Sequence, residues 1–202
     1  MTTAAELIVS ARYDLRDSDK TQYSDPMLLD YLNRGLRPLC AALASLRSDW
    51  VNSSTSLTLA SGDDDTDLPS DFISVINIKI GTNDLTKKSI SWIRDYLVSS
   101  SAGLPSYYAI QGTSILVEKE ADDDYTLLFE YNATTATLVS TDNMPYNNEF
   151  NDVLRQFLTL IGKSRNEYSI ISDAAMQDFF YAAVFSKLVS RNHVANVHRT
   201  TF

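Results

Sequence analysis

The sequence predicts an α+β fold, mainly α, in which a small antiparallel β-sheet is inserted between two pairs of helices that form a four-helix bundle. Apolar residues recur at helical spacing near both ends of the chain, whereas the middle consists of short β-rich runs separated by polar turns. The bundle is expected to combine residues 1–51 with residues 141–192. The β-rich subdomain is expected to span residues 52–140, and a C-terminal tail to span residues 193–202.

Two helices are expected before the sheet. The first covers about residues 4–16, where Leu7, Ile8, Ala11 and Leu15 stand at helical spacing. The segment Ser24-Asp25-Pro26 then supplies an N-capping side chain and a proline for the first turn of a second helix, which runs to about Ser48. Pro38 is expected to kink this helix, because proline removes one backbone hydrogen bond and clashes with the preceding turn.

The middle of the chain carries the strand signals. Strands are expected at Ser56–Leu59, Phe72–Ile80, Tyr107–Ile110, Ser114–Val117 and Tyr125–Tyr131, the last three as an antiparallel meander. Residues 61–67 are expected to form a polar loop, and Asn83-Asp84 a turn. Residues 88–97 are expected to hold a short strand at Ser89-Ile90-Ser91 and then a helical turn.

Helical spacing returns from Asn148, and Ser172-Asp173 caps a last helix that runs to about Arg191. This last helix is apolar nearly all round, so it needs cover on several sides. A chain of 202 residues has little else to supply that cover, and contacts with other subunits are therefore expected. The stretch from Lys187 to Phe202 has basic residues but no Asp or Glu, which is typical of an interaction tail, with a frayed terminus as the alternative.

Composition excludes several classes of protein. With 44% hydrophobic residues the chain is globular, and its formal net charge of −9 disfavours a nucleic-acid-binding module. An acidic surface does suit a protein that DNA slides past. No apolar run approaches the length of about 20 residues that spans a bilayer, and no signal peptide is evident, so a soluble protein made in the cytoplasm is expected. The single cysteine, Cys40, is expected in the core.

Two acidic segments invite a metal-site interpretation. They consist of Asp63, Asp64, Asp65 and Asp67, and of Asp122, Asp123 and Asp124. An EF-hand loop that began at Asp63 would need Gly and Glu where Leu68 and Ser74 stand, so solvated acidic loops are expected, with a loosely held surface cation as the alternative. No phosphate-binding loop, zinc-binding pair or nucleophile elbow occurs, and no catalytic residue, cofactor or metal is expected.

Several segments together resemble, in their order along the chain, the tailed-bacteriophage head-to-tail connector (adaptor) proteins. They are Tyr23–Gly35, Leu68–Phe72, Leu104–Gly112, Tyr125–Leu127 and Met144–Phe150. The resemblance spans about residues 5–190. It departs from the family at Glu118-Lys119-Glu120, where relatives often have a proline.

The resemblance implies a structural virion protein and not an enzyme. It implies a homododecameric ring at the head–tail junction, between the portal protein and the tail nozzle or tail tube, with a channel through which genomic DNA passes. On that basis the portal contact is expected at the C-terminal end, in Phe185, Lys187, Leu188, Arg191, His193, Val194, Val197, His198, Arg199 and Phe202. The two acidic segments are expected to face the lumen or the tail. Two alternatives remain: an adaptor-like cell-wall (muralytic) hydrolase, and a small non-viral binding module.

Overall fold

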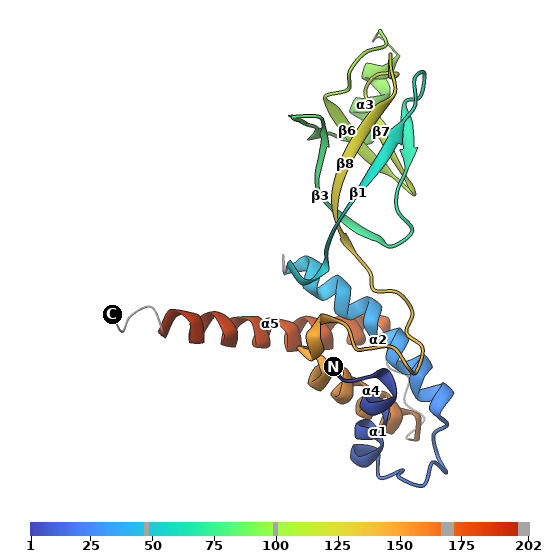
Figure 1. The fold of residues 1–202 in the computed structure, drawn as a ribbon, viewed down its shortest axis with the longest axis vertical. Coiled ribbons are helices and arrows are strands. Elements are labelled where there is room, and N and C mark those ends of the chain that lie inside the picture. Colours follow the sequence, from blue (N-terminus) through green and yellow to red (C-terminus); the bar gives the residue numbers. More distant parts are fainter. Residues whose placement is uncertain (47–48, 99–100, 167–171, 198–202) are drawn as a thin grey trace. The chain divides into compact units, whose positions relative to one another are not determined.

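The computed structural model describes residues 1–46, 49–98, 101–166 and 172–197. Within these residues the chain forms five α-helices and two small β-sheets (Figure 1). The chain divides into two compact units, Met1–Val51 with Thr134–Phe202, and Asn52–Ala133. The α+β prediction is thereby confirmed, whereas the predicted four-helix bundle is not confirmed.

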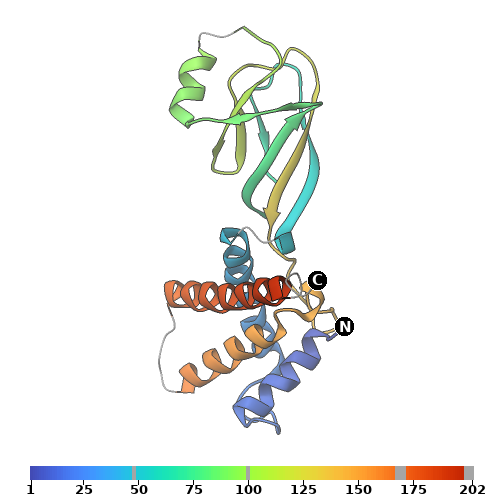
Figure 2. The same cartoon turned by 90° about the vertical axis from the view of Figure 1, so that its left-hand side faces the viewer.

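The first unit contains α1 (Ala4–Leu15), α2 (Asp25–Ser45), α4 (Asn151–Asn166) and α5 (Asp173–Val197). α1 packs against α4, and the two lie side by side in Figure 2, in blue and orange. α2 packs against both α4 and α5. Gly35 on α2 allows this close approach, because a Cβ atom there would lie 2.7 Å from two ring carbons of Phe157 on α4 and 3.3 Å from Phe180 on α5.

Capping side chains fix where the first two helices begin. Thr3 and Glu6 form a capping box at α1, and the Ser24 hydroxyl accepts a hydrogen bond from the Met27 amide at α2, with Pro26 in the first turn as predicted. α2 continues through Pro38 to Ser45, and its predicted end at Ser48 lies outside the described residues.

A buried ion pair holds the turn between α1 and α2. The Arg12 guanidinium lies 2.7 Å from the Asp17 carboxylate and 2.6 Å from that of Asp25, and both Arg12 and Asp17 are buried. Burial by itself raises the pKa of Asp17. The backbone amides of Gln22 and Tyr23, which donate to its carboxylate, and the charge of Arg12 outweigh that effect and hold the pKa below 3.8.

The second unit consists of strands and one helix. Its elements are β1 (Asn52–Leu59), β2 (Asp65–Asp67), β3 (Phe72–Ile80), β4 (Asn83–Asp84), β5 (Thr86–Lys87), α3 (Ile90–Leu97), β6 (Tyr107–Gln111), β7 (Ser114–Val117) and β8 (Tyr125–Ala133). They make two four-stranded sheets, in the orders β1-β8-β3-β4 and β2-β7-β6-β5. Both sheets contribute to one core, with Leu59, Ile78, Phe129, Ile115 and Val117 among its fully buried members.

The strand predictions need four corrections. Asp65–Asp67, predicted as loop, forms β2 because it pairs with β7, and Asn83–Asp84, predicted as a turn, pairs with β3 as β4. The predicted strand at Ser89-Ile90-Ser91 is instead the start of α3, since the Ser89 hydroxyl accepts from the Trp92 amide as an N-cap. The predicted meander is also wrong: β6 and β7 form a hairpin, but β8 leaves β7 and pairs between β1 and β3.

Candidate assembly surfaces

The last helix of the described chain, α5, has one buried and one exposed apolar face. Met176, Phe180 and Val184 are buried. Tyr181, Phe185 and Val189 are 49%, 51% and 47% exposed, and their spacing of four residues puts them in one row along the helix. The Tyr181 and Phe185 rings are stacked, with centroids 6.3 Å apart. We call these three residues the α5 row, and no described part of the chain covers it fully.

Only part of the predicted portal contact has described side chains. Phe185 is exposed, whereas Lys187 and Leu188 are half-buried. The Lys187 ammonium is used within the subunit, because it lies 2.6 Å from the Asp152 carboxylate and 5.7 Å from the centre of the Phe150 ring. Arg191, His193, Val194 and Val197 belong to α5 by their backbone, but their side chains, and all of His198, Arg199 and Phe202, lie outside the described residues.

The two acidic segments are neighbours in the second unit. The Gly62 amide donates to the Ala121 carbonyl (2.8 Å), the Ala121 amide donates to the Asp63 carbonyl (2.9 Å), and the Ser61 amide donates to the Asp124 carboxylate (2.9 Å). Six of the seven aspartates are exposed, and the seventh, Asp64, is half-buried. Carboxylates from two turns that are 55 or more residues apart in sequence therefore form one acidic surface, which we call the paired acidic turns.

A short hydrogen bond stabilises one of these turns. The Tyr125 hydroxyl donates to the Asp122 carboxylate at 2.5 Å. That bond, together with desolvation and the negative charges of Asp122 and Asp123, raises the pKa of Tyr125 to about 12. Among the described residues no group of three or more His, Cys, Asp or Glu side chains is arranged to hold a metal ion.

α3 and the start of β6 form an aromatic cluster that the sequence analysis does not predict. The rings of Trp92 and Tyr96 are stacked with centroids 5.0 Å apart, and Tyr107 meets Trp92 edge-on at 5.0 Å. The Lys88 ammonium lies 5.3 Å from the Trp92 ring centre and 5.0 Å from that of Tyr107. The predicted helical turn after residue 91 brings Trp92 and Tyr96 to one side of a helix, because they are four residues apart. The contacts with Tyr107 and Lys88 lie outside that turn and depend on the folded chain.

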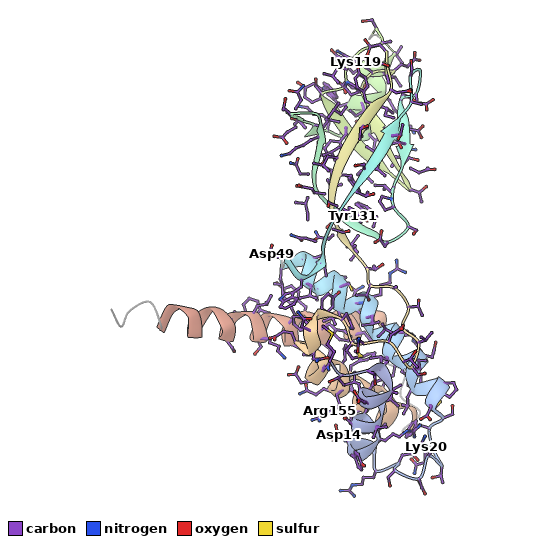
Figure 3. All side chains as sticks on the ribbon, in the orientation of Figure 1. Asp14, Lys20, Asp49, Lys119, Tyr131 and Arg155 are labelled. Carbon is purple, nitrogen blue, oxygen red and sulfur yellow. The ribbon has the colours of Figure 1, made fainter. Side chains whose placement is uncertain are left out.

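A shallow hollow lies between α1 and α4. Its volume is about 430 Å³, and it is lined by Asp14, Gln156, Thr159, Leu160 and Lys163. The Asp14 carboxylate is 3.1 Å from the Arg155 guanidinium, and both side chains are labelled in Figure 3. Among the described residues that line the hollow, Asp14 is the one carboxylate, whereas glycoside cleavage uses two.

None of the described helices is both long enough and apolar enough to cross a bilayer.

The sequence model of the SU10 adaptor protein family matches residues 2–193. The chain belongs to this family. The match covers nearly the whole chain and confirms the resemblance to phage head-to-tail adaptors. The family is one of bacteriophage structural proteins. No curated protein matches the sequence of this adaptor.

The segment Glu118-Lys119-Glu120 contains a buried carboxylate. Glu118 is 1% exposed. Its two carboxylate oxygens accept hydrogen bonds from the amides of Ser106 (2.8 Å) and Tyr107 (2.9 Å). Glu118 therefore fixes the entry into β6, and with it the place of Tyr107 beside Trp92.

Proposed function

We propose that this adaptor is a structural subunit of the virion that joins the portal protein to the tail nozzle or tail tube. The α5 row carries the proposal. Three large side chains, each about half exposed, form a continuous apolar strip on the longest helix of the described chain. Burying such a strip against another protein is favourable, at about 25 cal/mol per Å² of apolar surface. A protein whose function is to bind neighbours has a reason to keep it exposed until assembly.

In this proposal the C-terminal end of α5 and the tail beyond it bind the portal. The stretch after Asp178 contains no acidic residue, although the chain as a whole carries a net charge of −9. The same stretch contains Lys187, Arg191 and Arg199. A partner surface with an apolar groove and carboxylates at its rim would complement both the α5 row and these basic residues. Phe185 is the portal-contact residue that the single subunit leaves most exposed among those with described side chains.

The proposed assembly is a ring of twelve copies around a DNA channel. Contacts between one patch and a different patch on the next copy close a ring when the rotation between copies is right. The paired acidic turns would face the lumen or the tail, where their charge repels DNA phosphates and keeps the genome mobile. Changing these aspartates to asparagine should alter DNA retention or tail joining. If both stay normal, the turns are merely solvated.

We propose that the adaptor acts without catalysis. The alternative, a muralytic hydrolase, is tested by a zymogram in which purified protein is run in a gel that contains cell wall. Clearing by the full chain would contradict a purely structural role. Stable binding of a glycan or small molecule, together with no affinity for the portal, would favour the binding-module alternative.

The portal contact is tested by truncation. Deleting residues 192–202 should abolish attachment to purified portal rings, while the far-ultraviolet circular dichroism and the urea midpoint of the remaining chain stay close to those of the full chain. Tyr13→Ala is a suitable control, because Tyr13 is an aromatic residue on α1 that is 70% exposed. That variant should attach normally. Unchanged attachment of the truncated chain would contradict the proposed contact.

A further inference from the structure

Three of the four sheet edges in the second unit are protected against pairing with another strand. At the β3–β4 edge, β3 has register shifts between Phe72 and Ser74 and between Val75 and Asn77, and the Asn77 side chain accepts a hydrogen bond from the Ile78 amide. The outer strands β4 and β5 have two residues each, and β2 has three. Bulges, side-chain caps and very short outer strands are the usual devices that prevent edge-to-edge association.

The fourth edge, β1, is neither bulged nor very short, and a side-chain hydrogen bond from the Thr66 hydroxyl to the Thr58 carbonyl caps it near its Leu59 end. It is eight residues long, and its pairing with β8 runs without a shift from Asn52 to Leu59. Its sequence, Asn-Ser-Ser-Thr-Ser-Leu-Thr-Leu, contains no proline, no glycine and no charged residue. A long, regular and uncharged outer strand is a template for another strand.

Two hydrogen bonds determine which main-chain groups of β1 face outward. The Thr58 carbonyl accepts a hydrogen bond from the Thr66 hydroxyl (3.0 Å), so it points away from β8. β3 pairs with the opposite edge of β8. There the Ile78 carbonyl accepts a hydrogen bond from the Leu85 amide, so it points away from β8. This agrees with the orientation of β1, because Ile78 lies opposite Phe129, whose main-chain groups then face β1. Because the direction alternates along an antiparallel strand, the amides and carbonyls of Ser54 and Ser56 face the same outer side as Thr58. Neither serine has a main-chain partner there among the described residues.

The charges around this edge favour a basic partner. Glu130 on β8 lies directly opposite Ser54, is half-exposed, and makes no ion pair with a described residue. A strand added outside β1 would lie about 10 Å from β8, since neighbouring strands are about 4.8 Å apart. A lysine or arginine on that strand could reach Glu130 across the small Ser54 side chain. The paired acidic turns at the Leu59 end of β1 add further negative charge.

We propose that the outer edge of β1 binds an extended, basic segment of the tail-side partner by strand addition. Main-chain hydrogen bonds to Ser54 and Ser56 would supply the affinity, and an ion pair with Glu130 would help to set the register. A second copy of this chain is the less favoured occupant, because each copy carries a net charge of −9 and would bring its own acidic turns to the interface. This inference rests on the proposed function and identifies how its tail-side contact is made.

Hydrogen exchange on the whole chain tests the inference. Exchange is measured by mass spectrometry for residues 52–59, in the purified adaptor and in intact virions. In the purified chain, the Ser54 and Ser56 amides should exchange freely, while the amides of Ser53, Thr55 and Leu57, which face β8, are protected. In virions the two serine amides should slow tenfold or more.

The outcomes separate the inference from the function on which it rests. Absence of the chain from virions would overturn both. Presence of the chain in virions with unchanged exchange at Ser54 and Ser56 would overturn only the strand addition. Protection that appears in the purified chain as its concentration rises would identify a second copy as the occupant and overturn the tail-side assignment.

A matched pair of variants separates the main-chain contact from the side chain. Ser56→Pro removes the outward amide at a position where an outer strand tolerates proline, whereas Ser56→Thr keeps it. With equal urea midpoints, Ser56→Pro should lose tail joining and Ser56→Thr should retain it. Normal tail joining by a folded Ser56→Pro variant would overturn the inference. Glu130→Gln should weaken tail joining, and more so in low salt, where the ion pair is strongest.

Discussion

Replacing Phe185 by alanine should leave the isolated subunit folded and weaken its binding to the portal. Phe180, on the same helix, is the matched control. The two phenylalanines differ in burial, because Phe185 is 51% exposed and Phe180 is 0% exposed. Phe180→Ala should therefore destabilise the subunit itself.

The structure gives the expected magnitudes. A phenylalanine buries about 150–250 Å², and half of that area at about 25 cal/mol per Å² amounts to roughly 2.5 kcal/mol. Since alanine keeps part of the contact, Phe185→Ala should cost about 2 kcal/mol of binding free energy, or roughly thirtyfold in Kd per subunit. The loss of folding stability should stay below about 1 kcal/mol, the range of surface changes and helical side-chain pairs. Phe180→Ala should cost about 3–5 kcal/mol of folding stability.

The assay combines two measurements on each full-length variant. Urea denaturation gives the free energy of unfolding, and surface-plasmon titration of the subunit over immobilised portal rings gives Kd. Tyr181→Ala should behave like Phe185→Ala, because both belong to the α5 row.

Two results would refute this reasoning. If Phe185→Ala destabilised the isolated chain as much as Phe180→Ala, the α5 row would be covered within one subunit. If Phe185→Ala bound the portal with unchanged Kd, the row would be exposed but would belong to some other interface.

Three further predictions concern stability and ionisation. Gly35→Ala should lower the free energy of unfolding, measured in urea, by about 1–2 kcal/mol, because its Cβ would meet the Phe157 ring at 2.7 Å. The overpacking cost of about 1–3 kcal/mol exceeds the gain of about 1 kcal/mol in helix propensity. An unchanged or raised stability would show that the ring can move aside. Asp122→Asn should move the pKa of Tyr125 from about 12 towards 10.0 in an ultraviolet titration, because the bond to that carboxylate is the largest cause of the shift; a pKa that stays near 12 would contradict this. The pKa of Asp17 is below 3.8 in the folded chain, so the stability that its ionised form contributes is complete above pH 3.8 and is lost as the pH falls further. Acid unfolding of Asp17→Asn should lack that part of the pH dependence, and an acid-unfolding curve with the same slope as that of the wild type would disprove it.

Local chemistry made much of the fold predictable from the sequence. The start of α2 follows from Ser24, which accepts a hydrogen bond from the Met27 amide, and from Pro26 in the first turn. Both effects involve residues that are close in sequence. β3 and β7 have the predicted bounds, because segments rich in Ile and Val indicate a strand whatever its partner is. The start of α3 is also a local feature, because Ser89 caps it, although the β-propensity of Ile90 favours a strand at the same place.

Pairing between distant segments made the rest unpredictable. β2 consists of aspartates and a threonine and is a strand only because β7, about 50 residues later, supplies its ladder. β8 could form a hairpin with β7 by sequence, yet it pairs with β1 and β3, where Phe129 and Leu127 are fully buried. No local signal separates these alternatives.

The candidate surfaces, too, were predictable where they depend on local sequence and unpredictable where they depend on contacts between distant segments. An apolar α5 was evident from the sequence, but which of its faces is buried depends on Gly35 of α2 and Phe157 of α4. The two acidic segments were each visible, whereas their juxtaposition follows from hydrogen bonds that involve Gly62 and Ala121. The role of Glu118 depends on the backbone of residues 106 and 107, which it contacts only in the folded chain.

The most direct test of the proposed assembly is an electron cryo-microscopy reconstruction of the intact phage at the junction of head and tail. We expect this chain between the portal and the tail, with Tyr181, Phe185 and Val189 of α5 covered by a neighbouring virion protein. A junction that lacks the chain, or that contains it with those three side chains still facing solvent, would contradict the proposal.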